Sequence, residues 1–394
     1  MNRSMASSTG IPRAVWMLGF VSLFMDVSSE LIHSLLPVFM VTSLGATALM
    51  VGVVEGVAEA TALIVRVFSG TISDWLGRRK GLTVLGYGLG AISKPVFALA
   101  LTVHWVFAAR FMDRIGKGIR GAPRDALIAD LTPPEMRGAA YGLRQSLDTV
   151  GAFVGPLLAI GLMVLWAGDF RAVFWFAVIP AVVSVLILVF GVHEPGAGGA
   201  RPRPASPVEW RSLSEFGPEY WWIVVAGGVF TLARFSEAFL ILRAQQLGLA
   251  DSFAPLVLVI MNVVYALSAY PFGRLADRMS HGKLLAAGLA VLILSDLVLA
   301  LASGLAAVGA GVVLWGLHLG MTQGLLASMV AGAAPAHLRG TAFGFFNLVG
   351  GVAMLIASVL AGLLWDELGA AVTFYAGAAV SVLGLALLIL RRRS

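Results

Sequence analysis

The chain has 394 residues, of which 59% are hydrophobic and only 12% charged. Soluble domains are nearer one quarter charged, so this composition excludes a soluble enzyme. Because the sequence has no cysteine, it also excludes thiol and disulfide chemistry. The excess of 27 Lys and Arg over 21 Asp and Glu indicates orientation in a membrane rather than nucleic-acid binding.

Twelve apolar segments follow one another along the chain, and each can supply the roughly 20 apolar residues that a membrane-spanning helix needs. The first segment lacks the small-residue cleavage site of a signal peptide, so we expect a retained first helix. The expected helices lie at 14–43, 46–70, 81–102, 104–130, 140–166, 170–192, 219–245, 253–274, 284–303, 306–331, 341–365 and 370–390.

The positive charges assign an orientation to these helices. Nearly all loop and segment-end Lys and Arg fall on the side that carries both termini. The other side has only Arg171, with Arg243 near its boundary. Since cytoplasmic loops carry such an excess, we expect a multi-pass protein of the cytoplasmic (inner) membrane with both termini in the cytoplasm.

The two halves of the sequence repeat one another. Residues 193–218 are rich in Gly, Pro and Ser, and we expect them to form a cytoplasmic linker between six-helix bundles at 1–192 and 219–394. Parallel repeats of this kind place a substrate site between the bundles, near the midplane. The matching pairs, at a nearly constant separation, are Gly70-Thr-Ile-Ser-Asp74 with Gly273-Arg-Leu-Ala-Asp277, Arg137-Gly-Ala-Ala-Tyr-Gly142 with Arg339-Gly-Thr-Ala-Phe-Gly344, and Ser29-Glu30 with Ser236-Glu237.

Charged residues are concentrated within the predicted helices of the first half. Asp26, Glu30 and His33 lie within about 60° of one helix face, at about 100° per residue. Glu55 and Glu59 share a face of the second helix. A face of the fourth helix carries Arg110, Asp113, Arg114 and Lys117.

Two interpretations of these charges remain open. They form either a static ion-pair network or a wetted face whose pairs exchange when a proton or ligand binds. Asp26, Glu30 and His33 could also offer ligands to a divalent metal, but their spacing alone predicts no metal site. In the second half, Arg234 and Glu237 are three residues apart, so we expect a local ion pair on the seventh helix.

Several motifs resemble those of the major facilitator superfamily, in a little-characterised prokaryotic, exporter-like branch. The first, Gly70-x-x-x-Asp74-x-x-Gly77-Arg78-Arg79-Lys80, resembles the family's signature loop and recurs as Gly273-x-x-x-Asp277-Arg278. Trp75 departs from the Arg that the family often has there. Arg110-x-x-Asp113-x-x-Gly116-x-Gly118 resembles a pattern linked to proton coupling, and Gly151-x-x-x-Gly155-Pro156 resembles one typical of exporters.

The resemblance implies an all-α membrane protein with twelve transmembrane helices in two parallel six-helix bundles. We expect the loop residues Gly70, Asp74, Arg78, Arg79, Gly273, Asp277 and Arg278 to form a cytoplasmic latch that holds the outward-open state. Gly151, Gly155 and Pro156 are expected to allow tight helix packing.

The predicted function is secondary active transport of a small molecule by alternating access, with proton-coupled efflux (proton antiport). A divalent-metal or organic-anion transporter of the same fold, and a non-transporting membrane sensor, are alternatives. No nucleophile–base pair is visible, so we predict no enzyme activity, no catalytic residues and no cofactor. We expect a monomer in the lipid bilayer whose partners are its substrate and protons, with no nucleic acid. The predicted substrate and proton-coupling residues are Asp26, Glu30, His33, Glu55, Glu59, Arg110, Asp113, Arg114, Lys117, Arg234 and Glu237.

Overall fold

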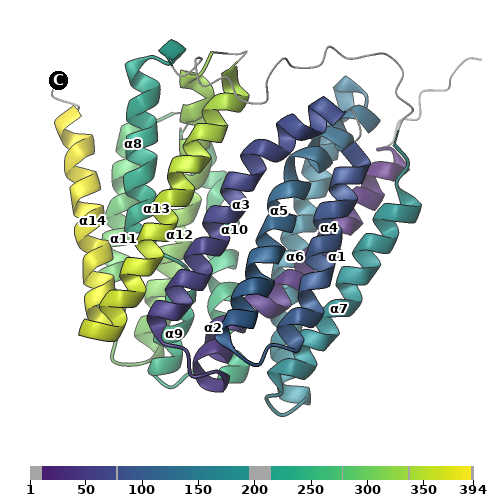
Figure 1. The fold of residues 1–394 in the computed structure, drawn as a ribbon. Helices are drawn as coiled ribbons and strands as arrows, with labels where there is room; N and C mark the ends of the chain where they lie inside the picture. Colours follow the sequence, from purple (N-terminus) through teal and green to yellow (C-terminus); the bar gives the residue numbers. More distant parts are fainter. Residues whose placement is uncertain (1–10, 77–78, 195–213, 277, 336–337, 392–394) are drawn as a thin grey trace, which may run out of the picture.

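The computed structural model describes residues 11–76, 79–194, 214–276, 278–335 and 338–391, and these parts are helical without any strand. Figure 1 shows the helices running roughly alongside one another. They are α1 (Arg13–His33), α2 (Leu36–Val38), α3 (Ala48–Leu76), α4 (Arg79–Ala98), α5 (Val103–Leu131), α6 (Arg137–Leu165), α7 (Phe170–Leu186), α8 (Pro218–Ala233), α9 (Ala238–Gln246), α10 (Leu256–Ala276), α11 (His281–Ala300), α12 (Leu305–Ala333), α13 (Arg339–Leu368) and α14 (Ala370–Arg391).

Ten helical stretches of the described chain are long and apolar enough to cross a membrane by length and composition. The two further long helices are α4 and α5, which have 20 and 29 residues but carry several charges. Together they make the twelve membrane helices of the predicted fold. The charges on α5 are tolerable because most of them are buried against other helices rather than facing lipid.

Two of the twelve expected helices are not continuous. The first bends at Ser34 and Leu35 and continues as α2 and a π-helical stretch, Phe39–Ser43. The seventh is interrupted between Ala233 and Ala238, where α8 ends and α9 begins. Interrupted membrane helices of this kind are tolerated where the freed backbone is buried in protein or lines a polar region.

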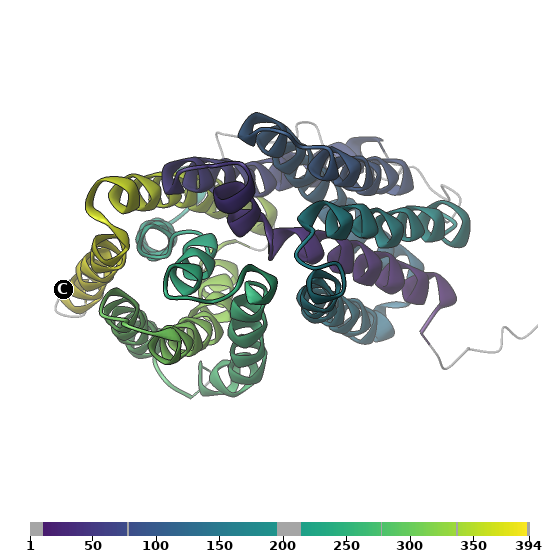
Figure 2. The ribbon, with the colours of Figure 1, turned by 90° about the horizontal axis from the view of Figure 1, so that it is seen from below.

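The helices form two groups, which lie side by side in Figure 2. In the first group α1 packs on α6 and α7, and α5 packs on α3 and α4; in the second, α12 packs on α10 and α11, and α11 on α14. The exact boundaries at 192 and 219 stay a prediction, and residues 195–213 of the expected linker lie outside the described residues.

Close packing of α3 against α13 joins the two groups. A Cβ on Gly362 would come within 2.5 Å of the Ala48 carbonyl oxygen, and one on Gly351 would meet Ala60 at 3.3 Å. The Asp366 carboxylate at the end of α13 accepts hydrogen bonds from the backbone amides of Ala48 (2.9 Å) and Leu49 (2.8 Å). This carboxylate therefore caps the start of α3 from the other bundle.

The buried core shows at which end the bundles meet. One large cluster draws on both bundles and includes Phe39, Phe170, Phe239 and Phe374, at the end remote from the termini. At the end that carries the termini, the described residues form separate clusters, one in the first bundle and two in the second. The buried core is thus shared by the two bundles at the remote end and divided between them at the terminal end, which we call the parted end.

Candidate functional site

A chain of buried ion pairs runs between α1, α3 and α5. Arg110 Nη2 lies 2.7 Å from Glu55 Oε2, and both side chains are at most 2% exposed. His33 bridges two carboxylates, with Nε2 3.5 Å from the same Glu55 oxygen and Nδ1 3.4 Å from Glu30 Oε2. Four predicted site residues from three helices are therefore brought together.

A second branch continues along α5. Arg114 lies 3.2 Å from Glu59 Oε1 on α3 and 3.2 Å from its neighbour Asp113. Asp113 also accepts from Lys94 Nζ at 2.7 Å, and Lys94 donates to Ser29 Oγ at 3.0 Å. The first-bundle charges thus form a connected set rather than isolated pairs.

Asp26 belongs to a different group from Glu30 and His33, although all three share one face of α1. Its carboxylate lies 3.7 Å from Arg120 Nη2, and the guanidinium of Arg120 lies 4.6 Å from the centre of the Tyr87 ring. The three residues share a face of α1 as predicted, but Asp26 pairs with Arg120 whereas Glu30 pairs with His33. Asp26 and His33 are seven residues apart, about 10 Å along the helix axis at 1.5 Å per residue, so they meet different partners.

The network is incompletely satisfied despite its burial. Glu55 Oε1, Arg110 Nε, Arg114 Nε and Arg120 Nη1 are buried and have no hydrogen-bond partner among the described residues. Buried polar groups of a purely structural network are normally paired, because each orphan costs free energy. These unused donors and the unused acceptor allow the ion pairs of the network to exchange partners.

In the second bundle, Arg234 and Glu237 lie on the interruption between α8 and α9, at the C-cap of α8 and the N-cap of α9. No ion pair within 4.0 Å joins them, so the expected helical pair is wrong. The reason is that the helix is broken at these residues. They stay within electrostatic range of each other, and Glu59 of the first bundle also lies within range of both.

Lys117 also differs from its neighbours on α5. It is exposed, whereas Arg110, Arg114 and Arg120 are buried. No described residue forms an ion pair with it within 4.0 Å. Acids on α1, α3 and α6 lie within its electrostatic range, namely Asp26, Glu30, Glu59 and Asp148.

The exporter-type glycines bring α6 against α1. A Cβ on Gly151 would lie 2.6 Å from the Leu23 carbonyl oxygen, and one on Gly155 would lie 2.9 Å from that of Val27. Pro156 is buried inside α6. Larger residues at the two glycines would push apart the helix that carries Asp26 and Glu30.

The predicted latch is described only in part. Arg79 pairs with Asp130 at 2.8 Å, and its backbone amide donates to Glu194. Arg278 is exposed. Gly70 approaches Ala122, whereas a Cβ on Gly273 would meet no atom within 4 Å. Arg78, Asp277 and the side chain of Asp74 lie outside the described residues.

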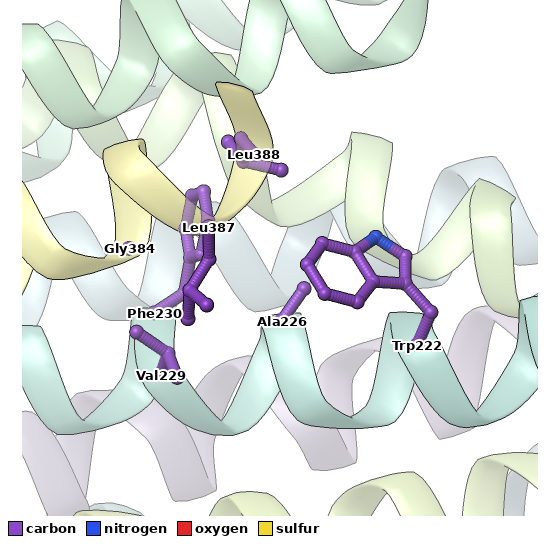
Figure 3. Close-up of a pocket in the computed structure, with 7 residues that line it drawn as sticks. All are labelled: Trp222, Ala226, Val229, Phe230, Gly384, Leu387 and Leu388. Carbon is purple, nitrogen blue, oxygen red and sulfur yellow. The ribbon is translucent and has the colours of Figure 1, made fainter. Parts of the chain in front are cut away.

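No alternative site stands out elsewhere. The described residues contain no group of three His, Asp or Glu placed to hold a metal ion. A small cavity of about 10 Å³ between α8 and α14 (Figure 3) includes none of the predicted site residues. Its lining is apolar apart from one indole nitrogen: Trp222, Ala226, Val229, Phe230, Gly384, Leu387 and Leu388.

Three residues that contact the charged groups, Lys94, Asp148 and Tyr87, are not among the predicted site residues. Lys94 sits on α4, where no other charge recurs at helical spacing, so no local pattern marks it as the partner of Asp113. Asp113 has a second basic partner, its neighbour Arg114.

Twelve membrane helices in two parallel bundles, with a network of buried charges in the first bundle, form the architecture of a membrane transporter. The sequence matches the family model described as Major Facilitator Superfamily over residues 18–243 and 235–394. The chain belongs to this superfamily, and it is a multi-pass membrane transporter rather than an enzyme.

Individual relatives agree with this assignment. The chain is 30% identical over 390 residues to an uncharacterized MFS-type transporter of Methanocaldococcus jannaschii, covering 96% of this chain and 95% of that protein. It is 31% identical over 144 residues to the multidrug resistance protein MdtH of Edwardsiella ictaluri, covering 36% and 35%. A crystal structure of a POT family transporter with 5-aminolevulinic acid superposes with a TM-score of 0.81 at 15% identity, covering 96% of each chain.

Proposed function

We propose that this protein exports a small molecule across the cytoplasmic membrane in exchange for protons. The observation that carries the proposal is the buried, incompletely satisfied ion-pair chain through Glu30, His33, Glu55 and Arg110. It lies within the first bundle, between α1, α3 and α5.

The chemistry of this ion-pair chain suits the coupling of proton binding to a conformational change. A proton taken up by Glu30, Glu55 or Glu59 cancels one charge and releases its basic partner. Because the released guanidinium or imidazole must find another acceptor, the network has at least two pairings. An element with two discrete arrangements is what a ligand or proton needs in order to shift a conformational equilibrium.

Export and orientation are supported by separate features. The Gly151 and Gly155 contacts with α1 resemble the helix packing of exporters, and the partial match to a multidrug resistance protein points the same way. The charge asymmetry of the loops supports cytoplasmic termini. With that orientation, the parted end faces the cytoplasm, where an exporter loads. We retain a monomer and the bundle limits 1–192 and 219–394 as part of the proposal.

Proton exchange in liposomes tests the proposal. The purified protein is reconstituted with a pH-sensitive dye inside, a pH gradient is applied, and four probes are added in turn: benzoate, D-glucarate, ethidium and Mn²⁺. We expect at least one probe to cause proton movement in wild type. That movement should be lost in Asp26→Asn and Glu30→Gln but kept in the control Glu367→Gln, an exposed acid at the end of α13.

The result that would overturn the proposal is also defined. Proton movement at wild-type rates in both Asp26→Asn and Glu30→Gln would remove these acids from coupling. Transport of a probe without any proton movement would remove proton exchange itself.

A further inference from the structure

A second group of charges lies around Asp26, apart from the ion-pair chain described above. Arg120 Nη2 lies 3.7 Å from Asp26 Oδ1, and the same guanidinium lies over the Tyr87 ring. The Tyr87 hydroxyl lies 3.3 Å from Arg124 Nη1, and that nitrogen lies 3.9 Å from Asp148 Oδ1. Asp148 on α6 is thus connected to Asp26 on α1, although it is outside the predicted site.

The carboxyl groups of Asp26 and Asp148 also face each other. A Cβ on Gly151 of α6 would lie 3.1 Å from the Asp26 Cβ, and Asp148 stands one turn before Gly151 on that helix. Arg124 Nη1 bridges the same gap, because it donates to Ser22 Oγ, one turn before Asp26, at 3.0 Å. The two carboxyl groups lie within hydrogen-bonding range of each other. Since ionised carboxylates only accept hydrogen bonds, a bond between them requires a proton on one of the two.

The neighbouring arginines favour Asp26 as the acid that carries this proton. Asp148 has two of them in ion-pair range, Arg144 at 3.4 Å and Arg124 at 3.9 Å. Within the described part of the chain Asp26 has one, Arg120 at 3.7 Å. Two guanidinium groups stabilise an anion more than one does, so Asp148 stays ionised and accepts the hydrogen bond from Asp26.

Protons can reach this pair of acids. The side chains of Asp26 and Asp148 are 21% and 24% exposed, against 1% for Glu55. Asp26 follows Met25, which belongs to the core cluster of the first bundle at the parted end. It precedes Val27, which belongs to the cluster that both bundles share. The pair therefore lies at the level where the core divides between the bundles.

Other titratable and charged side chains stand on the elements packed around the pair. Lys117 lies within electrostatic range of both acids, so it does not decide which of them holds the proton. On α7 the one charged residue, Arg171, stands at the start of the helix, and Asp251 before α10 accepts from Gln245. The remaining groups are Glu30 on α1, Asp125 on α5, Tyr141 on α6, and Tyr265, Tyr270 and Arg274 on α10.

We propose that Asp26 and Asp148 share one proton across the contact between α1 and α6, and that this is the proton that the transporter exchanges. Asp26 binds the proton through a new O–H bond and donates it to Asp148, which acts as a positioning residue. Arg120 then loses its carboxylate partner but keeps the Tyr87 ring. On release the proton passes to water and the ion pair forms again. The inference rests on the proposed function, because it names the acids that hold the exchanged proton.

Infrared titration of the purified protein in lipid nanodiscs tests the inference, because a protonated carboxyl group and a carboxylate absorb separately. Between pH 8 and pH 5.5 we expect wild type to gain a carboxylic-acid band that Asp26→Asn lacks. In Asp148→Asn the neighbouring anion is gone, so the midpoint of that band should fall by about one pH unit or more. Asp148→Glu keeps the anion and should keep the wild-type midpoint.

Two further variants separate electrostatic effects from disturbed folding. Arg144→Gln removes a cation next to Asp148, so it should raise the midpoint, opposite to Asp148→Asn. Asp125→Asn is the matched control, because it takes away another carboxylate that lies 3.1 Å from Arg124 and leaves the pair of acids in place. We expect its midpoint to equal that of wild type.

A carboxylic-acid band that persists unchanged in Asp26→Asn, or a wild-type midpoint in Asp148→Asn, overturns the inference. Either result leaves proton exchange standing if wild-type liposomes still move protons when a probe is added. Absence of that movement contradicts the proposed function instead, and the infrared midpoints still decide whether the two carboxyl groups share a proton.

Discussion

The Glu55–Arg110 pair offers a direct test of how the buried charges are held. Its atoms are 2.7 Å apart and its side chains are 1% and 2% exposed. Removing one partner of such a pair strands the other charge and typically costs about 3–5 kcal/mol. Removing both charges together costs much less, because no buried charge is left alone.

The structure places the single variants near the lower end of that range. In Arg110→Gln, Glu55 keeps His33 at 3.5 Å, and in Glu55→Gln, Arg110 keeps Glu59 at 3.8 Å. We therefore expect each single variant to lose about 3 kcal/mol, and Glu55→Gln/Arg110→Gln to recover most of the loss.

Unfolding of the purified variants in detergent by denaturant titration measures these free energies, with Glu367→Gln as the surface control. Additive losses in the double variant would refute the reasoning, since independent sites add and coupled ones do not. The double variant is also expected to lose proton-coupled transport although it folds, because the pair that a proton would break is gone.

Three further perturbations follow from the packing. Asp296 on α11 is fully buried, and neither carboxylate oxygen has a hydrogen-bond partner in the described part of the chain, so Asp296→Leu should raise stability by about 1–3 kcal/mol in the same titration; a loss would reveal a partner. Asp366→Ala removes the cap on α3 and should cost about 0.5–2 kcal/mol, whereas an unchanged midpoint would mean that water replaces the carboxylate. Gly362→Leu would drive a side chain into the Ala48 backbone, so we expect poor folding on expression; a well-folded variant would show that α3 and α13 can separate at little cost.

Most of the fold could be predicted from the sequence, because apolar runs of membrane length and a repeat with one nearly constant offset leave few arrangements. The interruption of the seventh helix could not. Residues 231–238 contain neither Gly nor Pro, and the break is visible only where α8 and α9 pack against their neighbours.

The sequence could predict which helices carry the residues of the candidate site, but not which side chains pair with one another. Helical spacing put Glu30 and His33 on one face, where they lie within ion-pair distance, but it did not predict that the acids of α3 meet the bases of α5. Spacing along one helix does not show which residues of a neighbouring helix lie at the same level. It therefore could not show that Asp26 and Glu30 have different partners. Spacing also could not show that Lys117 has no ion pair among the described residues, because this depends on which acids pair with the neighbouring bases in the tertiary fold.

The central claim is that protonation of the buried network moves one bundle relative to the other. Because the chain has no native cysteine, spin labels at Glu135→Cys, before α6, and Met279→Cys, between α10 and α11, report the separation at the parted end. In lipid nanodiscs, we predict that the interspin distance changes between pH 8 and pH 5.5 and that Asp26→Asn abolishes the change. A single distance, the same at both pH values and in both proteins, would contradict the account.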